Sequence, residues 1–159
     1  MEDAKMNVFS VSHGCGQCSF HLVWKPKYAF SILVGDVKSE CERVFREVAE
    51  DRGFVLFALE VMPDHVHVFV GFHPTVSVSE VLQAFKGVSA RRLFQRFPHL
   101  RRRYWGGHLW SRGKFFRSVG STTDKAVKHY IECSQHGWHK TSREIEDLDS
   151  RQTRIIQYA

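Results

Sequence analysis

Short apolar runs and apolar residues at helical spacing divide the chain into expected strands and helices. Residues 19–24 and 54–61 form apolar runs of strand length. Residues 65–72 form a third run, which begins with alternating histidines and valines, so we expect three strands there. Only the short turn at residues 62–64 separates the last two strands, which predicts a hairpin. A further strand is expected around residues 114–119, after a segment with glycine turns.

Two segments carry apolar residues at helical spacing. In the first, Asp36 is placed to cap a helix that ends before Gly53. In the second, Ser77 and Glu80 have the spacing of a capping box, and Pro98 closes the helix. The apolar positions are Val37, Cys41, Val44, Phe45 and Val48 in the first helix and Val78, Val81, Leu82, Phe85, Val88, Leu93 and Phe94 in the second.

A last helix is expected to begin at Thr122 or Thr123, and a polar tail covers residues 141–159. The expected order is then strand, helix, strand, strand, helix, strand, helix. This is the split βαβ order of an α+β, ferredoxin-like fold, in which helices pack on one face of a single antiparallel sheet. With no repeat, low-complexity block or linker, residues 1–159 are expected to form one domain with a core over about residues 19–138.

The composition of the chain is that of a globular protein. Its 159 residues are 43% hydrophobic and 13% aromatic, which is enough apolar material for a buried core. The N-terminal residues lack the apolar stretch of a signal peptide, and no run approaches the ~18 apolar residues of a membrane span. We therefore expect a cytoplasmic protein with no membrane partner.

The four cysteines do not indicate a disulfide framework, because the chain shows no export signal. Cys15 and Cys18 form a CxxC pair next to His13 and His21, which raises the question of a zinc site. The other two cysteines are isolated, so no second pair of ligands stands at the spacing of a zinc finger. We expect Cys15 and Cys18 to be ordinary thiols.

The positive charge of the chain is concentrated in one segment. The net charge is +6, yet residues 81–123 contain ten basic residues and no acidic one, while the remainder has 13 basic against 17 acidic residues. Aromatic side chains are interleaved with these basic ones, a combination that favours contact with a phosphate backbone and stacked bases. The segment therefore predicts nucleic-acid binding. The candidate DNA-binding residues are Lys86, Arg91, Arg92, Arg101, Arg102, Arg103, Arg112 and Lys114.

Two histidines lie two residues apart in the alternating run. Because side chains alternate across a strand, His65 and His67 face one way, while Val66, Val68 and Val70 face the core. The pair is either two surface histidines or part of a metal site. Two imidazoles are too few for structural zinc, but one further oxygen ligand would make a site for Mg²⁺ or Mn²⁺, acting as a Lewis acid on a phosphodiester.

Tyr130, in the last expected helix, is a candidate nucleophile for such a phosphate. It is flanked by Lys128 and His129 and is followed by further polar residues. A helical tyrosine is more often a packing residue, so this role depends on whether the helix lies beside the histidine strand.

Five segments of the chain occur in the order typical of a known family. They are FHLVWKPKYAF, VMPDHVHVFV, VLQAFKGVSARRLFQRFP, GHLWSRGKFFRSVG and VKHYIECSQ. Over about residues 20–135 the chain resembles the HUH-type, single-tyrosine transposases of prokaryotic insertion sequences and their REP-associated relatives. The resemblance implies a homodimeric, ferredoxin-like DNA transposase that binds single-stranded DNA hairpins at the ends of its element. It also implies that His65 and His67 bind the metal ion and that Tyr130 attacks the scissile phosphate, forming a 5′-phosphotyrosine bond without a nucleotide cofactor.

The third metal ligand departs from the pattern of the family. The family supplies a glutamine four residues after the tyrosine, where this chain has Ser134. Gln135 lies about 140° around an ideal helix from Tyr130, and a π-bulge would bring it back to the site. We expect Gln135 to be the third ligand, with Ser134, His136 or water as the alternatives.

Two other functions stay open. A domesticated REP-associated relative would cut repeated palindromes without carrying a mobile element. A non-catalytic module would bind single-stranded nucleic acid on the same kind of sheet, as RRM-type proteins do. The module is disfavoured because the sheet has no recognisable aromatic RNP motif, whereas His65, His67 and Tyr130 are all present.

Overall fold

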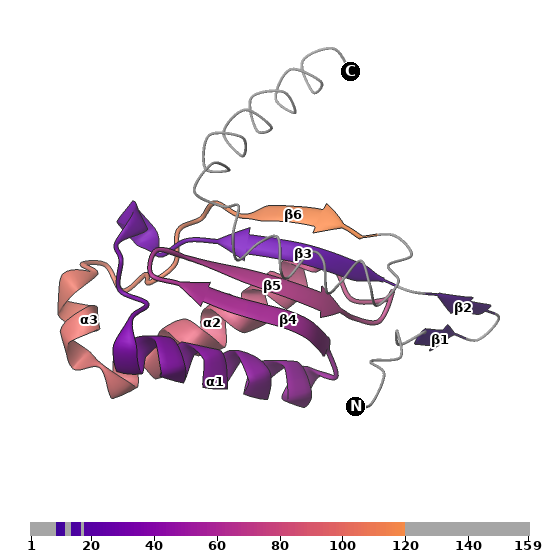
Figure 1. The fold of residues 1–159 in the computed structure, drawn as a ribbon, viewed down its shortest axis with the longest axis horizontal. Coiled ribbons are helices and arrows are strands. Elements are labelled where there is room, and N and C mark those ends of the chain that lie inside the picture. The colour runs from indigo at the N-terminus through magenta and orange to yellow at the C-terminus, as the bar shows by residue number, and fades with distance from the viewer. Residues whose placement is uncertain (1–8, 12–13, 17, 120–159) are drawn as a thin grey trace, which may run out of the picture. The chain divides into compact units, whose positions relative to one another are not determined.

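The computed structural model of the chain describes residues 9–11, 14–16 and 18–119, which belong to one compact unit, Lys5–Ser121. Figure 1 shows how the helices and strands of these residues are arranged. The last expected helix and the polar tail lie outside the described residues. The same holds for Tyr130, Ser134, Gln135 and His136.

One sheet of four strands and two long helices make up most of the described fold. Their bounds are β3 Ser19–Trp24, α1 Gly35–Arg52, β4 Val55–Met62, β5 His65–Gly71, α2 Val78–Arg96 and β6 Phe115–Ser118. The strands pair in the order β4-β5-β3-β6, and every pair is antiparallel (Figure 1). Each helical connection skips one strand of the sheet, which is the split βαβ arrangement. The expected ferredoxin-like fold class is confirmed.

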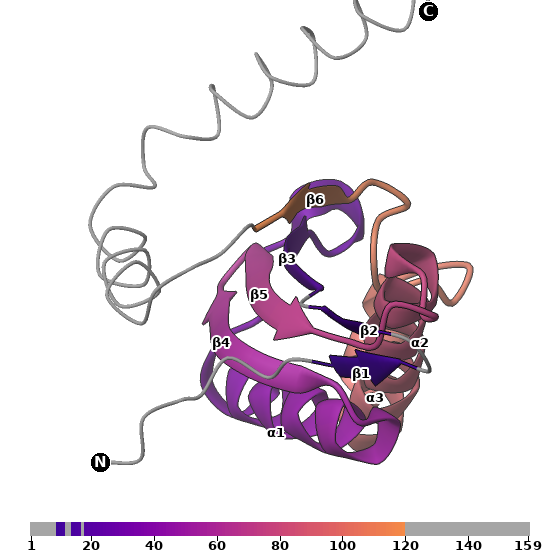
Figure 2. The same cartoon turned by 90° about the vertical axis from the view of Figure 1, so that its right-hand side faces the viewer.

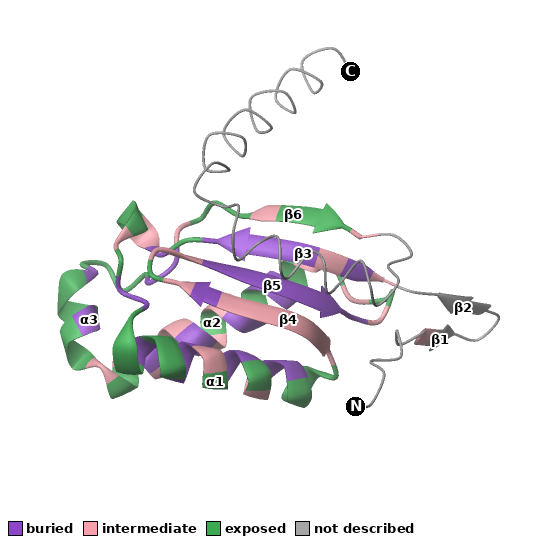
Figure 3. Ribbon diagram, in the orientation of Figure 1, coloured by how far each residue is buried: buried purple, intermediate pink, exposed green. Residues whose placement is uncertain are grey.

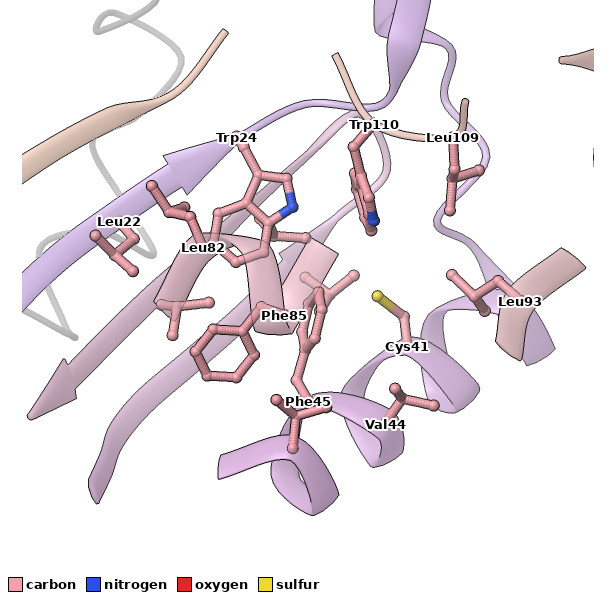
Figure 4. Close-up of a cluster of buried hydrophobic side chains, with 14 of the residues drawn as sticks. Leu22, Trp24, Cys41, Val44, Phe45, Leu82, Phe85, Leu93, Leu109 and Trp110 are labelled. Atoms are coloured by element: carbon pink, nitrogen blue, oxygen red, sulfur yellow. The ribbon is translucent and has the colours of Figure 1, made fainter. Parts of the chain in front are cut away.

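Both helices pack on the same face of the sheet (Figure 2). In the core that results, the ring of Trp24 contacts Phe45 of α1 and Phe85 of α2, with centroid distances of 5.5 and 6.2 Å (Figure 4). Figure 3 shows that β5 is buried along most of its length, whereas β6 is largely exposed. The sheet residues that face the helices with 1% exposure or less are Leu22, Trp24, Val61, Val66, Val68 and Val70.

The ends of the two helices agree with the sequence in one case and differ in the other. The Ser77 hydroxyl accepts from the Glu80 backbone N–H at 3.2 Å, and the Glu80 carboxylate accepts from the Ser77 N–H at 2.7 Å, so the expected capping box is confirmed. Asp36 as the cap of α1 is wrong, because Val34 occupies the N-cap position. The chain enters the helix through Gly35 with a left-handed φ of 54°, which carries the carboxylate of Asp36 into the first turn, where the helix dipole favours it.

Four short elements were not expected from the sequence. β1 Phe9–Val11 and β2 Gly14–Gly16 form a small antiparallel hairpin, and a 3₁₀ turn, η1 Lys27–Ala29, follows β3. Pro98 ends α2 as expected, but it also begins a further helix, α3 Pro98–Arg103, because the first turn of a helix requires no proline N–H. None of the helices that the structure describes combines the length and hydropathy needed to cross a bilayer.

A β-bulge in β4 shifts its register against β5. The register shifts by one residue between Leu56 and Ala58, so Phe57 is the inserted residue. Its ring packs over Gly71, where a Cβ atom would lie 2.9 Å from the ring. Residues three positions apart on a regular strand face opposite ways, but the bulge lets both Leu56 and Leu59 pack against the core.

Candidate metal centre and nucleic-acid interface

β5 presents valines to the helices and histidines to the other face of the sheet. Val66, Val68 and Val70 are fully buried. His65 and His67 lie next to each other on the opposite face, with ring centroids 4.8 Å apart. Their exposed fractions are 20% and 7%. The prediction that both histidines point away from the core is confirmed.

Asp64, in the turn between β4 and β5, orients His65. Oδ1 of Asp64 lies 2.6 Å from Nδ1 of His65, and the carboxylate accepts the hydrogen bond from the ring. The ring proton therefore sits on Nδ1, and the lone pair is on Nε2. Histidines that bind metal ions commonly donate their other ring nitrogen to a carboxylate in this way.

His21, from the adjacent strand β3, holds His67 in a similar manner. Nε2 of His21 lies 3.1 Å from Nδ1 of His67, and the two rings are within 12° of parallel. Val23 is the residue directly opposite His67 in the pairing of β3 with β5, so His21 reaches His67 along the diagonal of the open face. When His21 accepts this hydrogen bond, the lone pair of His67 is on Nε2, as in His65.

Burial keeps both of these histidines neutral. Desolvation, reinforced by the positive charge of Arg117, lowers the pKa of His21 to about 4. Desolvation also lowers the pKa of His67 to about 3, with smaller contributions from His21 and His65. A histidine must be neutral to bind a metal ion. His67 is already neutral at neutral pH, so it can bind the ion without first releasing a proton.

The donor set fits a divalent metal ion that takes further ligands from elsewhere. In both His65 and His67 a hydrogen bond occupies Nδ1, and Nε2 is the atom suited to ligation. Among the residues that the structure describes, no three His, Cys, Asp or Glu side chains converge as a metal-binding group. The pair is therefore an incomplete site, and the predicted third ligand Gln135 and the predicted nucleophile Tyr130 lie outside the described residues.

Cys18 has the properties of an ordinary thiol. It is partly buried, and burial raises the pKa of its thiol, which disfavours the thiolate that zinc binds. His21, which is close to Cys18 in the sequence, is engaged with His67 instead. The side chain of Cys15, like His13, lies outside what the structure describes.

The predicted DNA-binding residues fall into two groups. Two of them make contacts within the protein: Nζ of Lys86 donates to the carbonyl of Ser111 at 2.8 Å, and Arg92 binds the carboxylate of Glu47 in α1. Burial, together with the charge of Lys114, lowers the pKa of Lys86. The exposed members are Arg91, Arg101, Arg102, Arg103, Arg112 and Lys114. Contact of any of these residues with DNA stays a prediction.

Asp64 and His21 were missed as parts of the site. From the sequence, Asp64 is only a turn residue and His21 only a neighbour of the CxxC pair. Two signals for these residues were available in the sequence. One is a single histidine inside the apolar run of β3, and the other is a carboxylate directly before His65. The partner of His21 becomes evident only when the sheet order places β3 beside β5, whereas the partner of Asp64 is its neighbour in the sequence.

Comparison with known proteins identifies the family. The family described as Transposase IS200 like matches residues 15–134. The chain belongs to this family. This IS200-like transposase is 38% identical to the ISDra2 transposase TnpA of Deinococcus radiodurans over 120 residues, which are 76% of this chain and 85% of the relative. It is 28% identical over 131 residues to the transposase for insertion sequence element IS200 of Salmonella typhimurium, with 80% of this chain and 86% of the relative covered.

Solved structures agree with this assignment. The crystal structure of a Deinococcus radiodurans R1 protein assigned as a transposase is 36% identical to the IS200-like transposase described here, with a TM-score of 0.66, over 78% of this chain and 95% of that one. The REP-associated tyrosine transposase, solved bound to a REP hairpin, shares the fold at 17% identity and a TM-score of 0.52, over 87% and 76% of the two chains. The resemblance found in the five sequence segments is confirmed, and the protein is a DNA-processing enzyme of the transposase class.

Proposed function

We propose that this transposase cleaves and rejoins single-stranded DNA at the hairpin-bearing ends of a mobile element, through a 5′-phosphotyrosine bond. The observation that carries the proposal is the pair His65 and His67, each hydrogen-bonded through Nδ1 by a neighbouring side chain. Membership of the IS200-like family supports a mobile element as the context. The relative that was solved with a REP hairpin supports hairpin DNA as the substrate.

The histidine pair would hold Mg²⁺ or Mn²⁺ through its Nε2 atoms, with Gln135 as the third ligand. When bound, such an ion acts as a Lewis acid and stabilises the charge on the phosphate oxygens. Asp64 and His21 fix the tautomer and the ring orientation of His65 and His67. These two residues are positioning residues, because they act on DNA only through the histidines.

Tyr130 supplies the nucleophile in this proposal. Its phenolic oxygen forms a bond to phosphorus while the bond from phosphorus to the 3′ oxygen breaks. The phenol loses its proton, and the departing 3′ oxygen gains one. A 3′-hydroxyl later attacks the phosphotyrosine, which restores a phosphodiester and frees the tyrosine. Because the tyrosyl ester keeps the energy of the cleaved bond, no nucleotide cofactor is required.

The exposed basic residues would hold the DNA backbone during these steps. Arg101, Arg102 and Arg103 make up the last turn of α3, and Arg112 and Lys114 precede β6. Their positive charge suits the phosphates of a DNA strand, because basic side chains bind that backbone by displacing its counterions. We also infer a homodimer, in which the tyrosine of one subunit can act in the site of its partner.

A covalent-adduct assay tests the proposal. The protein is mixed with Mn²⁺ and single-stranded DNA that carries the hairpins flanking its own gene, and the products are separated on a denaturing gel. We expect a protein–DNA adduct that disappears with a chelator and in Tyr130→Phe, while Tyr130→Phe still binds the hairpin. Tyr104→Phe is the matched control, because the buried hydroxyl of Tyr104 has no hydrogen-bond partner among the described residues.

Two results would contradict the proposal. An adduct that persists in Tyr130→Phe would assign the nucleophile to another residue. Hairpin binding by the unmodified protein without any adduct would favour a non-catalytic binding module instead.

A further inference from the structure

An unfavourable backbone conformation displays Tyr28 on the surface. Its φ and ψ angles are 65° and 13°, and the next residue, Ala29, also has a positive φ of 51°. They are the only non-glycine residues with positive φ in the described part of the chain. Residues with a Cβ atom adopt this left-handed conformation reluctantly, and strain of this kind is concentrated at binding and active sites. The Tyr28 side chain is nevertheless 61% exposed, so burial of its ring does not account for the strain.

The ring of Tyr28 is held in place by other aromatic rings. It lies parallel to the ring of Tyr104, at 8° and a centroid distance of 6.4 Å, and it contacts Phe30 at 5.4 Å. Tyr104 is buried, with 1% exposure, and is therefore a fixed support. A ring that is rigidly supported yet open to solvent loses little entropy when another ring stacks on it.

Two cations stand beside these rings. Nζ of Lys27 lies 5.0 Å from the centroid of Tyr28, and the guanidinium of Arg103 lies 4.4 Å from the centroid of Phe30. Lys27 has a long side chain that can turn from the ring to a phosphate. An exposed aromatic ring with adjoining cations is the arrangement by which proteins bind single strands, since the ring stacks on a base and the cations meet the backbone.

The loop that carries Tyr28 lies at the end of the sheet where the histidine pair begins. At the end of β3, Val23 pairs with His67. After η1 the chain returns to the same end, where the backbone N–H of Leu33 donates to the carbonyl of Pro63 in the β4–β5 turn. Figure 1 shows this loop and the β4–β5 turn at one end of the sheet, together with α3.

We propose that Tyr28 is a stacking platform for one unpaired base of the bound DNA strand, next to the phosphate held at the histidine pair, with Lys27 and Arg103 on the flanking phosphates. The proposal rests on the proposed function, because it places DNA at that pair. Stacking accepts any base, so this platform would position the strand without reading its sequence. The platform makes one contact with one nucleotide, whereas the exposed basic residues contact phosphates along the strand.

Binding measurements with abasic DNA test the platform. All proteins carry Tyr130→Phe, so that binding is measured without cleavage. Fluorescence anisotropy is recorded with hairpin DNA in which one nucleotide at a time, around the expected cleavage site, lacks its base. We expect Tyr28→Leu to weaken binding of intact DNA by roughly 5- to 150-fold, and Tyr28→Phe to bind as tightly as Tyr28. Tyr28→Gly, which relieves the left-handed strain, should lose the same factor as Tyr28→Leu while keeping the fold.

The abasic series identifies the base and separates stacking from a general loss of structure. Removal of the base at one position should weaken binding to the protein with Tyr28 by the same factor as Tyr28→Leu weakens binding of intact DNA. In Tyr28→Leu, removal of that base should not weaken binding any further. Two results would overturn the platform. One is that the proteins with Tyr28 and with Tyr28→Leu bind the DNA equally tightly. The other is that the loss from Tyr28→Leu and the loss from base removal add at every abasic position. Failure of the proposed function is detected separately, because the protein with both Tyr28 and Tyr130 would then form no covalent adduct with the hairpin DNA, whatever the binding series shows.

Discussion

The proton of a buried histidine resides on the nitrogen that its neighbours allow. For His67 the neighbour is Nε2 of His21, 3.1 Å from Nδ1. An acceptor at this position keeps the proton on Nδ1 and the lone pair on Nε2. Without it the proton can move to Nε2, and the ring then presents a donor where a metal ligand is required. His21 can in this way control metal binding through its hydrogen bond to His67.

Metal binding by His21 variants tests this control. We expect His21→Phe, which removes the acceptor but keeps a ring, to weaken Mn²⁺ binding by about 10- to 100-fold in isothermal titration calorimetry of the metal-free protein. His21→Gln should recover part of the loss, because its amide oxygen can accept from Nδ1 of His67. His73→Phe is the control, since His73 bonds Thr75 instead. Unchanged Mn²⁺ affinity in His21→Phe would show that His67 does not depend on this hydrogen bond.

At the scale of elements, α2 illustrates a helix whose start is encoded locally. Ser77 and Glu80 exchange hydrogen bonds through the capping box. The bonds satisfy backbone N–H groups that would otherwise have no partner within the helix. The start of α2 is therefore specified by residues of its own first turn, without a contribution from α1.

Unfolding measurements on Ser77 variants test the contribution of this cap. We expect Ser77→Ala to reduce the free energy of unfolding by about 1 kcal/mol, and Ser77→Gly by only a few tenths of that, because glycine is itself tolerated at the N-cap. Ser79→Ala is the matched control, as Ser79 is an exposed residue inside the same turn. Urea unfolding followed by circular dichroism gives the values. Equal stability of the Ser77→Ala protein and the unsubstituted protein would contradict a stabilising cap.

Elements with a local signal were predictable from the sequence, whereas contacts between residues far apart in the chain were not. The alternation of β5 and the cap of α2 are visible within a few residues. α3 was missed because its six residues bury only Leu100 and offer no apolar period. The contact of His21 with His67 joins residues 46 positions apart, and only the pairing of β3 with β5 brings them together. The roles of Tyr130 and Gln135 stay predictions, because both residues lie outside the described part of the chain.

At the scale of the whole molecule, charge that is concentrated in the sequence is partly neutralised by folding. Residues 81–123 contain no acidic residue, but α2 packs against α1, and arginines of α2 form ion pairs with glutamates of α1. Arg92 binds Glu47, and Nε of Arg96 lies 3.6 Å from Glu40. Fewer basic residues are therefore available to bind phosphates, and to displace counterions from a nucleic acid, than the sequence suggests.

The salt dependence of DNA binding distinguishes the two kinds of basic residue. We expect replacement of Arg101, Arg102 and Arg103 by glutamine to weaken single-strand binding and to lower the slope of log K against log salt by about 2, if all three contact phosphates. Arg92→Gln is the matched control and should leave the slope nearly unchanged, because Glu47 already pairs with Arg92. Titrations at several salt concentrations give the slopes. An unchanged slope in the triple variant would move the binding surface away from α3.

The alternation of β5 also restricts how this protein can change over generations. A residue deleted from β5, or inserted without a bulge of the kind that Phe57 makes in β4, would reverse the direction of every side chain beyond it, so that valines would face water and imidazoles would enter the apolar core. The core and the chemistry would then be lost in a single event. Descendants that keep the fold but lose the reaction through a change in β5 are therefore expected to arise by substitution, for example at His67, and the length of this strand is expected to be inherited even by inactive copies.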